Sequence, residues 1–105
     1  MEQKNTPFMA IHPGELVKEE IEARGISQKK LSEIMGLPYT MLNEIINGKR
    51  NITTETALLL EAALDINAEM IVNMQSAYNM QVARQNKNLS ARFDAVRKAY
   101  AALML

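Results

Sequence analysis

GISQKKLSEIMGLPYTMLNEIINGKR, residues 25–50, predicts two short helices that meet at a tight turn. Ser27 is a favourable N-cap for a helix over residues 28–35, because its hydroxyl can accept a hydrogen bond from a free N–H of the first turn. Gly36 follows that helix at a point where only glycine adopts the left-handed conformation at little cost. Pro38 then suits the start of a second helix, over residues 39–47, since the first turn needs no N–H there.

The second helix has two chemically different arcs. Leu42, Ile45 and Ile46 share one arc, which we expect to pack inward. The opposite arc and its flank carry polar or amphipathic side chains of a size that suits a DNA groove, namely Tyr39, Thr40, Asn43, Glu44 and Asn47. Lys49 and Arg50 follow directly, so groups that read base edges lie beside charges that suit phosphates. The segment therefore predicts DNA binding, the alternative being a helical hairpin that only packs.

The predicted DNA contacts follow from side-chain chemistry. The carboxamides of Gln28 and Asn43 can pair bidentately with adenine, while Thr40 suits a thymine methyl group or a phosphate. Glu44 can accept a hydrogen bond from cytosine N4 or orient a neighbour, and Tyr39 suits either a base or the sugar-phosphate backbone. Backbone N–H groups at two helix starts suit phosphates. The predicted DNA-binding residues are Ser27, Gln28, Tyr39, Thr40, Asn43, Glu44, Asn47, Lys49, Arg50 and Thr53.

This segment resembles the helix-turn-helix of the phage repressors. The defining positions of that motif are occupied by Leu31, Ser32, Met35, Gly36, Leu37, Leu42 and Ile45. Serine stands at position 32, where the motif prefers alanine, and it is nearly as small. The resemblance implies an all-α fold built as a compact five-helix domain, to which this chain adds a C-terminal helix.

The remaining helices are predicted from caps and apolar spacing. A first helix opens at His12-Pro13-Gly14 and ends at Gly25, and a fourth spans residues 55–64 after a threonine cap. The fourth helix should be largely buried, because its apolar groups lie on several sides. A fifth runs from Ala68 to about residue 85. We expect an N-terminal arm (1–10), a DNA-binding domain (11–83) and a C-terminal helical extension (84–105), with Phe8, Met9 and Ile11 covering part of the core.

The C-terminal extension has an apolar stripe of its own. After a break at residues 86–88, apolar residues recur at spacings of 4, 3, 4 and 3, namely Leu89, Phe93, Val96, Tyr100 and Leu103. This heptad-like pattern indicates one face of a helix that something must bury. Packing on its own domain and pairing with another chain are both open.

Composition excludes several functions. The 105 residues contain no cysteine and one histidine, which argues against disulfide scaffolds, thiol catalysis and a metal site. His12 is therefore interpreted as a surface or capping residue. No glycine-rich phosphate loop or nucleophile–base pair is present, so we expect no catalytic residue and no cofactor. No run of about 20 apolar residues and no secretory signal is visible, which favours a cytoplasmic protein without a membrane contact.

Charge is unevenly distributed along a chain whose net charge is zero. Residues 27–51 carry a net charge of +2, residues 52–83 carry −4, and residues 84–105 carry +4. The sign of the nearby charges sets the electrostatic potential at a docking surface. A net charge of zero for the whole chain is therefore compatible with a DNA-binding face.

Three further stretches narrow the resemblance. HPGEL (12–16), LNEIINGKRNITTETALLL (42–60) and NMQSAYNM (73–80) are similar to the HigA/VapI-type antitoxins, over about residues 11–83. This resemblance implies a homodimer that binds a palindromic operator on double-stranded DNA and represses its own operon. It also implies a toxin partner, usually a RelE-like ribonuclease. The alternatives are a free-standing regulator without a toxin and a protein-interaction module that has lost DNA binding.

Overall fold

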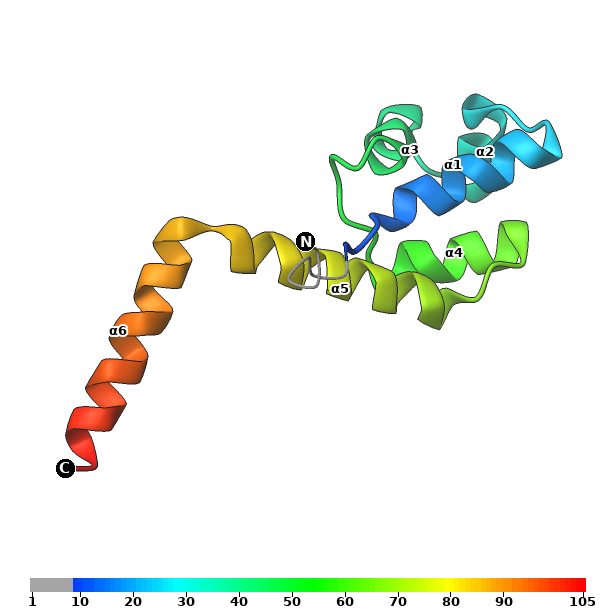
Figure 1. The fold of residues 1–105 in the computed structure, drawn as a ribbon. Coiled ribbons are helices and arrows are strands. Elements are labelled where there is room, and N and C mark those ends of the chain that lie inside the picture. Colours follow the sequence, from blue (N-terminus) through cyan, green and yellow to red (C-terminus); the bar gives the residue numbers. More distant parts are fainter. Residues whose placement is uncertain (1–8) are drawn as a thin grey trace, which may run out of the picture.

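The computed structural model describes residues 9–105, which form six α-helices and no strand (Figure 1). The all-α class and the additional C-terminal helix are confirmed. The helices are α1 (Pro13–Arg24), α2 (Gln28–Met35), α3 (Tyr39–Ile46), α4 (Thr54–Leu64), α5 (Ala68–Gln85) and α6 (Lys87–Leu103). Within the described residues, no helix is long and apolar enough to cross a membrane.

The predicted caps fix the ends of α2 and α4. Ser27 Oγ accepts a hydrogen bond from the backbone N–H of Lys30 at 3.0 Å, and Thr53 Oγ1 accepts from that of Thr56 at 3.2 Å. Gly36 is left-handed, with φ of 70°, as the turn requires. Pro38 lies immediately before α3, so the helix starts one residue later than the proline itself.

The core lies among α1 to α5. Val17, Leu31, Leu42, Ile45 and Leu60 are almost completely buried. Packing of α1 and α2 against α3, and of α4 against α2 and α5, encloses these residues. This arrangement holds α3 on the outside of the domain with only its apolar arc covered (Figure 1).

Three expectations about burial are wrong. Leu58 is 53% exposed, so α4 is buried on one side only. Met9 and Ile11 are 58% and 54% exposed, so they do not cover the core. Phe8 and the rest of residues 1–8 lie outside the described residues. His12 is only 4% exposed, so the surface interpretation of this residue fails, while the capping interpretation is confirmed.

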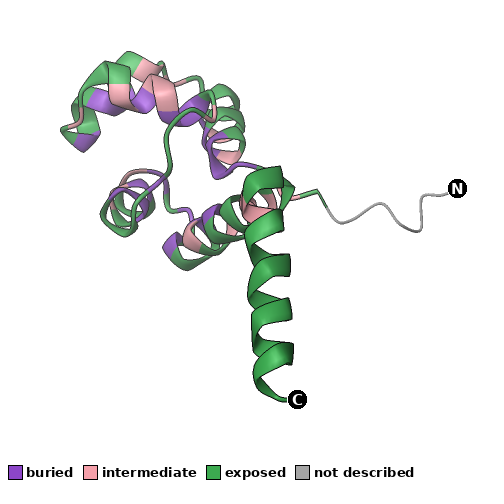
Figure 2. Ribbon diagram, turned by 90° about the vertical axis from the view of Figure 1, so that its left-hand side faces the viewer, coloured by how far each residue is buried: buried purple, intermediate pink, exposed green. Residues whose placement is uncertain are grey.

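The break before the last helix is a single residue rather than the three expected. Asn86 caps α6 with its side chain, which accepts a hydrogen bond from the backbone N–H of Leu89 at 2.9 Å. From there α6 extends away from the other helices, and none of its residues is buried (Figures 1 and 2). The radius of gyration is 18.2 Å, whereas a compact chain of this length has about 13 Å.

Candidate nucleic-acid interface

The exposed arc of α3 is the centre of the candidate interface. Its inward residues Leu42, Ile45 and Ile46 are 0%, 0% and 3% exposed. Thr40 is exposed, and Asn43 is half-buried. The two arcs therefore separate as the apolar spacing predicts, and the polar arc is not sealed inside the domain. α6 points away from this surface and does not cover it (Figure 1).

Two of the predicted base-reading residues contact each other. Asn43 donates a hydrogen bond from Nδ2 to Oε1 of Gln28 at 2.9 Å. Gln28 is the first residue of α2, and Asn43 lies in the middle of α3, so this bond joins the two helices of the motif at their polar edge. Both side chains are half-buried, which restricts their rotamers before any ligand arrives.

Glu44 and Arg50 form an ion pair at the end of the interface. Nη2 and Nε of Arg50 lie 2.7 and 2.8 Å from Oε1 of Glu44. The two side chains remain 45% and 48% exposed, so the pair adds little to stability. The pair instead places the Arg50 guanidinium beside α3. Orienting Arg50 and accepting a hydrogen bond from cytosine N4 both stay predictions for Glu44.

The other predicted residues differ in how free their side chains are. Tyr39 is 48% exposed, and Lys49 projects from the turn after α3 without an ion pair among the described residues. Asn47 ends α3, and its Nδ2 donates to the backbone carbonyl of Asn43 at 2.9 Å, so this amide group is directed at its own helix. The hydroxyls of Ser27 and Thr53 cap their helices, and both residues are exposed.

Gly14 and His12, which sequence reasoning did not assign to the site, determine how α1 supports α3. A Cβ added to Gly14 would lie 1.9 Å from the backbone oxygen of Ile45, so α1 meets the end of α3 backbone to backbone. His12 Nδ1 accepts a hydrogen bond from the N–H of Gly14 at 2.9 Å, and its ring packs edge-on against Tyr78 with 5.0 Å between centroids. Burial lowers the pKa of His12, an effect that the Arg50 carbonyl and the Glu15 carboxylate partly oppose.

Gln75 fixes the segment that follows Arg50. This glutamine is 4% exposed, and its Oε1 accepts a hydrogen bond from the backbone N–H of Ile52 at 2.8 Å. Its Nε2 donates to Oδ1 of Asn51 at 3.1 Å and to Oδ1 of Asn79 at 2.9 Å. The signal was present in the sequence, because Gln75 stands four residues after Ile71 within the apolar stripe of α5.

Metal binding finds no support in the described part of the chain. No group of three or more His, Asp or Glu side chains within residues 9–105 is placed to hold a metal ion. The amides, hydroxyls and cations on and beside α3 suit recognition of a duplex groove.

Comparison with known proteins points to the same class. The helix-turn-helix family model matches residues 17–71. Virulence-associated protein I of Dichelobacter nodosus is 40% identical over 52 residues, which cover 49% of this chain and 48% of that protein. The chain thus spans about half the length of the curated relatives it matches.

Two solved structures extend the similarity to most of the chain. An addiction module antidote protein of the HigA family from Coxiella burnetii has a TM-score of 0.71 and 30% identity, covering 84% of this chain and 95% of that one. Antitoxin HigA of Pseudomonas aeruginosa, solved with the higBA promoter, has a TM-score of 0.70 and 26% identity, covering 83% of this chain and 90% of that one. The fold is therefore that of DNA-binding, antitoxin-like helix-turn-helix proteins.

Proposed function

Because this chain belongs to the helix-turn-helix family, with HigA- and VapI-type proteins as its relatives, we propose that it is an antitoxin that represses its own operon. One observation carries the DNA-binding part of this proposal. The polar arc of α3 stays exposed while Leu42 and Ile45 on its other arc are buried, so the helix can enter a major groove without unfolding. The similarity to a promoter-bound antitoxin supports the same docking mode.

Each predicted contact has a role in this mode. Gln28 and Asn43 read base edges together, and Thr40 lies beside them on the exposed arc. Lys49 binds phosphate. Arg50 also binds phosphate, either while it stays paired with Glu44 or after that ion pair opens. The helix starts after Ser27 and Thr53 offer backbone N–H groups to phosphates. A homodimer places two α3 helices about 34 Å apart on a palindromic operator.

The second part of the proposal is neutralisation of a RelE-like ribonuclease toxin. The relatives named as antidote and antitoxin support it, since one of them matches 84% of this chain. This activity requires the product of a neighbouring gene. Co-expression of this chain with that gene product, followed by copurification, tests the proposed neutralisation. We expect the two proteins to copurify, and the gene product to arrest growth when it is expressed without this chain. A chain that binds its operator but has no such partner is a free-standing regulator.

Footprinting on the upstream region tests the DNA-binding part. We expect the footprint to show two protected half-sites one helical turn apart. In a gel shift with the same DNA, the affinity of the complex should fall as the salt concentration rises. Thr40→Ala, on the exposed arc, should weaken the complex. The matched control is Ser76→Ala, which also removes an exposed hydroxyl and lies on α5 outside the predicted set. Absence of any complex at low salt would overturn the proposal in favour of a pure protein-interaction module.

A further inference from the structure

The apolar stripe of α6, defined as Leu89, Phe93, Val96, Tyr100 and Leu103, is largely uncovered, although its own chain half-buries Leu89. No residue of α6 is buried, and Val96, Tyr100 and Leu103 are 65%, 62% and 77% exposed. Figure 2 shows this helix standing clear of the rest of the molecule. Because a lone helix of this length is marginal in water, the stripe needs a partner surface.

The link between α5 and α6 prevents α6 from folding back onto its own α5. Two antiparallel helices that pack together need a connection of about 2–5 residues, whereas Asn86 alone separates these two. Phe93 and Met80 line the inside of the elbow between α5 and α6, together with the stem of Arg84. Phe93 is thus partly covered by α5, whereas Val96, Tyr100 and Leu103 lie farther along α6, beyond the reach of their own domain.

The charges beside the stripe disfavour pairing of α6 with α6 of a second copy. Arg92 and Arg97 flank the stripe at the two heptad positions, g and e, that face each other in a parallel pair. The only acid in the helix, Asp94, lies 3.0 Å from Arg97 of the same helix. Each α6 carries four cations and one acid, so either orientation of such a pair would bring like charges together.

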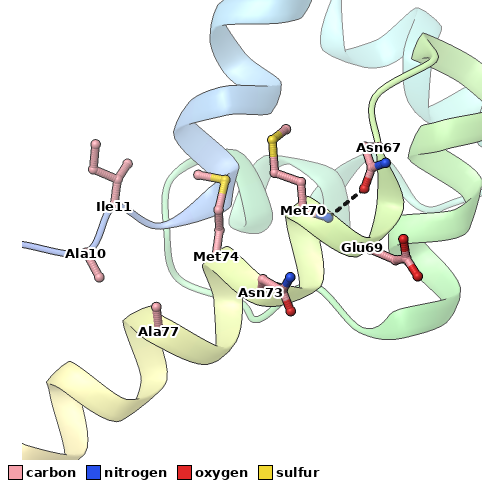
Figure 3. Close-up of a pocket in the computed structure, with 8 residues that line it drawn as sticks. All are labelled: Ala10, Ile11, Asn67, Glu69, Met70, Asn73, Met74 and Ala77. Carbon is pink, nitrogen blue, oxygen red and sulfur yellow. Dashed lines mark hydrogen bonds between the residues drawn. The ribbon is translucent and has the colours of Figure 1, made fainter.

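A complementary surface lies on α5. Met70, Met74 and Ala77 line an open cavity of about 560 Å³ beside the segment that precedes α1 (Figure 3). Met70 is 44% exposed, and Glu69 stands at the rim of the cavity. Residues 52–83 carry four acids and no lysine or arginine, which is the opposite sign to the C-terminal helix. This surface thus offers an apolar floor with one acid, Glu69, at its rim, within the negatively charged part of the chain.

We propose that α6 is an exchanged arm, whose apolar stripe packs into the Met70–Ala77 cavity on α5 of a second copy of this chain. The second copy returns its own α6 in the same way, which closes a two-fold symmetric dimer. Arg92 and Arg97 then face the acidic surface around Glu69 of the other copy. This inference rests on the dimer of the proposed function and assigns the surface that forms it, without requiring DNA or a toxin.

Solution mass and cross-linking test the exchange on the full chain without DNA. Light scattering should give twice the chain mass of 11.8 kDa. Unlabelled and 15N-labelled chains are mixed in the unfolded state and refolded together. The refolded protein is then treated with a zero-length carbodiimide. In an Arg97→Lys variant, which keeps the positive charge on the flank of the stripe, peptides that join position 97 to an acid of residues 55–69 should appear with one light and one heavy half. Light–light and heavy–heavy links alone would show that α6 contacts its own domain, which overturns the proposal.

Two pairs of variants test the surfaces. Val96→Glu should convert the dimer to a monomer, whereas the control Ala95→Glu, next to it on the other side of α6, should leave the dimer unchanged. Arg97→Glu and Glu69→Arg should each raise the dimer dissociation constant at least tenfold, and an equimolar mixture or the double variant should recover it. Charge restoration of this kind is not expected if α6 pairs with α6.

The outcomes separate this inference from the proposed function. A monomer in the wild-type protein, or a dimer that Val96→Glu leaves intact, overturns the exchanged arm whatever the DNA results are. A dimer with Cys cross-links between two Tyr100→Cys chains, in a protein that has no cysteine of its own, favours α6–α6 pairing and also overturns it. Loss of operator binding in a chain that still forms the exchanged dimer overturns only the proposed function.

Discussion

Nδ2 of Asn43 and Oε1 of Gln28 are 2.9 Å apart, so the amide of α3 is held by the amide of α2. The bond leaves Oδ1 and one N–H of Asn43, and both N–H groups of the Gln28 amide, for a ligand. A carbonyl oxygen and an amide N–H side by side match the N6 and N7 edge of adenine. The two residues are therefore one recognition unit in the proposed complex rather than two independent contacts.

Replacement of Asn43 should show this coupling. Asn43→Ala is expected to weaken operator binding by about 1–3 kcal/mol and to relax the preference at one base pair. Gln28→Ala should cause a loss of the same kind, and the double variant should lose less than the sum of the two, because the residues act through one bond. Fluorescence anisotropy on the operator and on single-base variants measures both effects. Equal losses on operator and random DNA would refute the base-reading role.

Lys49 should behave differently, because a phosphate contact carries no sequence information. Lys49→Ala is expected to weaken binding to the operator and to random DNA by the same factor. It should also reduce the slope of log K against log salt by about one. Lys18→Ala, an exposed lysine on α1 outside the predicted set, is the matched control and should change neither quantity. An unchanged salt slope for Lys49→Ala would remove this residue from the interface.

Local signals explain why most of the fold was predictable. Ser27, Gly36 and Asn67 set helix ends through bonds to residues within four positions, and such bonds are readable from a short window. The burial of His12 was not readable in this way. It depends on Tyr78, which belongs to α5 and comes near the ring only after α1, α3 and α5 have packed.

The candidate site was predictable as a set of residues but not as a set of bonds. The chemistry of Gln28 and of Asn43 predicts a base contact for each residue separately, and nothing in the local pattern joins positions 15 apart. The Glu44–Arg50 pair was likewise outside any helical spacing, since Arg50 lies beyond the end of α3. The apolar stripe of α6 was also predictable only in part. Periodicity predicts an apolar helix face but does not identify the surface that covers it.

Gly14 should tolerate no side chain, although it lies inside a helix. Gly→Ala in a helix normally stabilises a protein by roughly 0.5–1 kcal/mol. Here the new Cβ would lie 1.9 Å from the Ile45 oxygen, so Gly14→Ala should instead destabilise by about 1–3 kcal/mol, as overpacking does. Urea denaturation measures the change in free energy of unfolding. Glu15→Ala, at the next and exposed position, is the control, and equal stability of the two variants would contradict the close contact.

His12 should make the stability depend on pH. Burial lowers its pKa in the folded protein, whereas the unfolded chain has the usual value of about 6.5. Below that pH the unfolded chain binds a proton that the folded chain resists, so the free energy of unfolding should fall as the pH drops below about 6.5. The fall should level off once the pH passes the folded pKa, because both states are then protonated. Protonation also removes the Nδ1 acceptor that caps α1.

Denaturation of the wild type and of His12→Asn at several pH values between about 5 and 8 tests this dependence. Asparagine is among the best N-caps and does not titrate in this range. The variant should lose stability at all pH values, because it lacks the ring that packs on Tyr78. Its free energy of unfolding should nevertheless change less with pH than that of the wild type. Since the carboxylates elsewhere in the chain are the same in both proteins, parallel pH curves would show that His12 is not the titrating group.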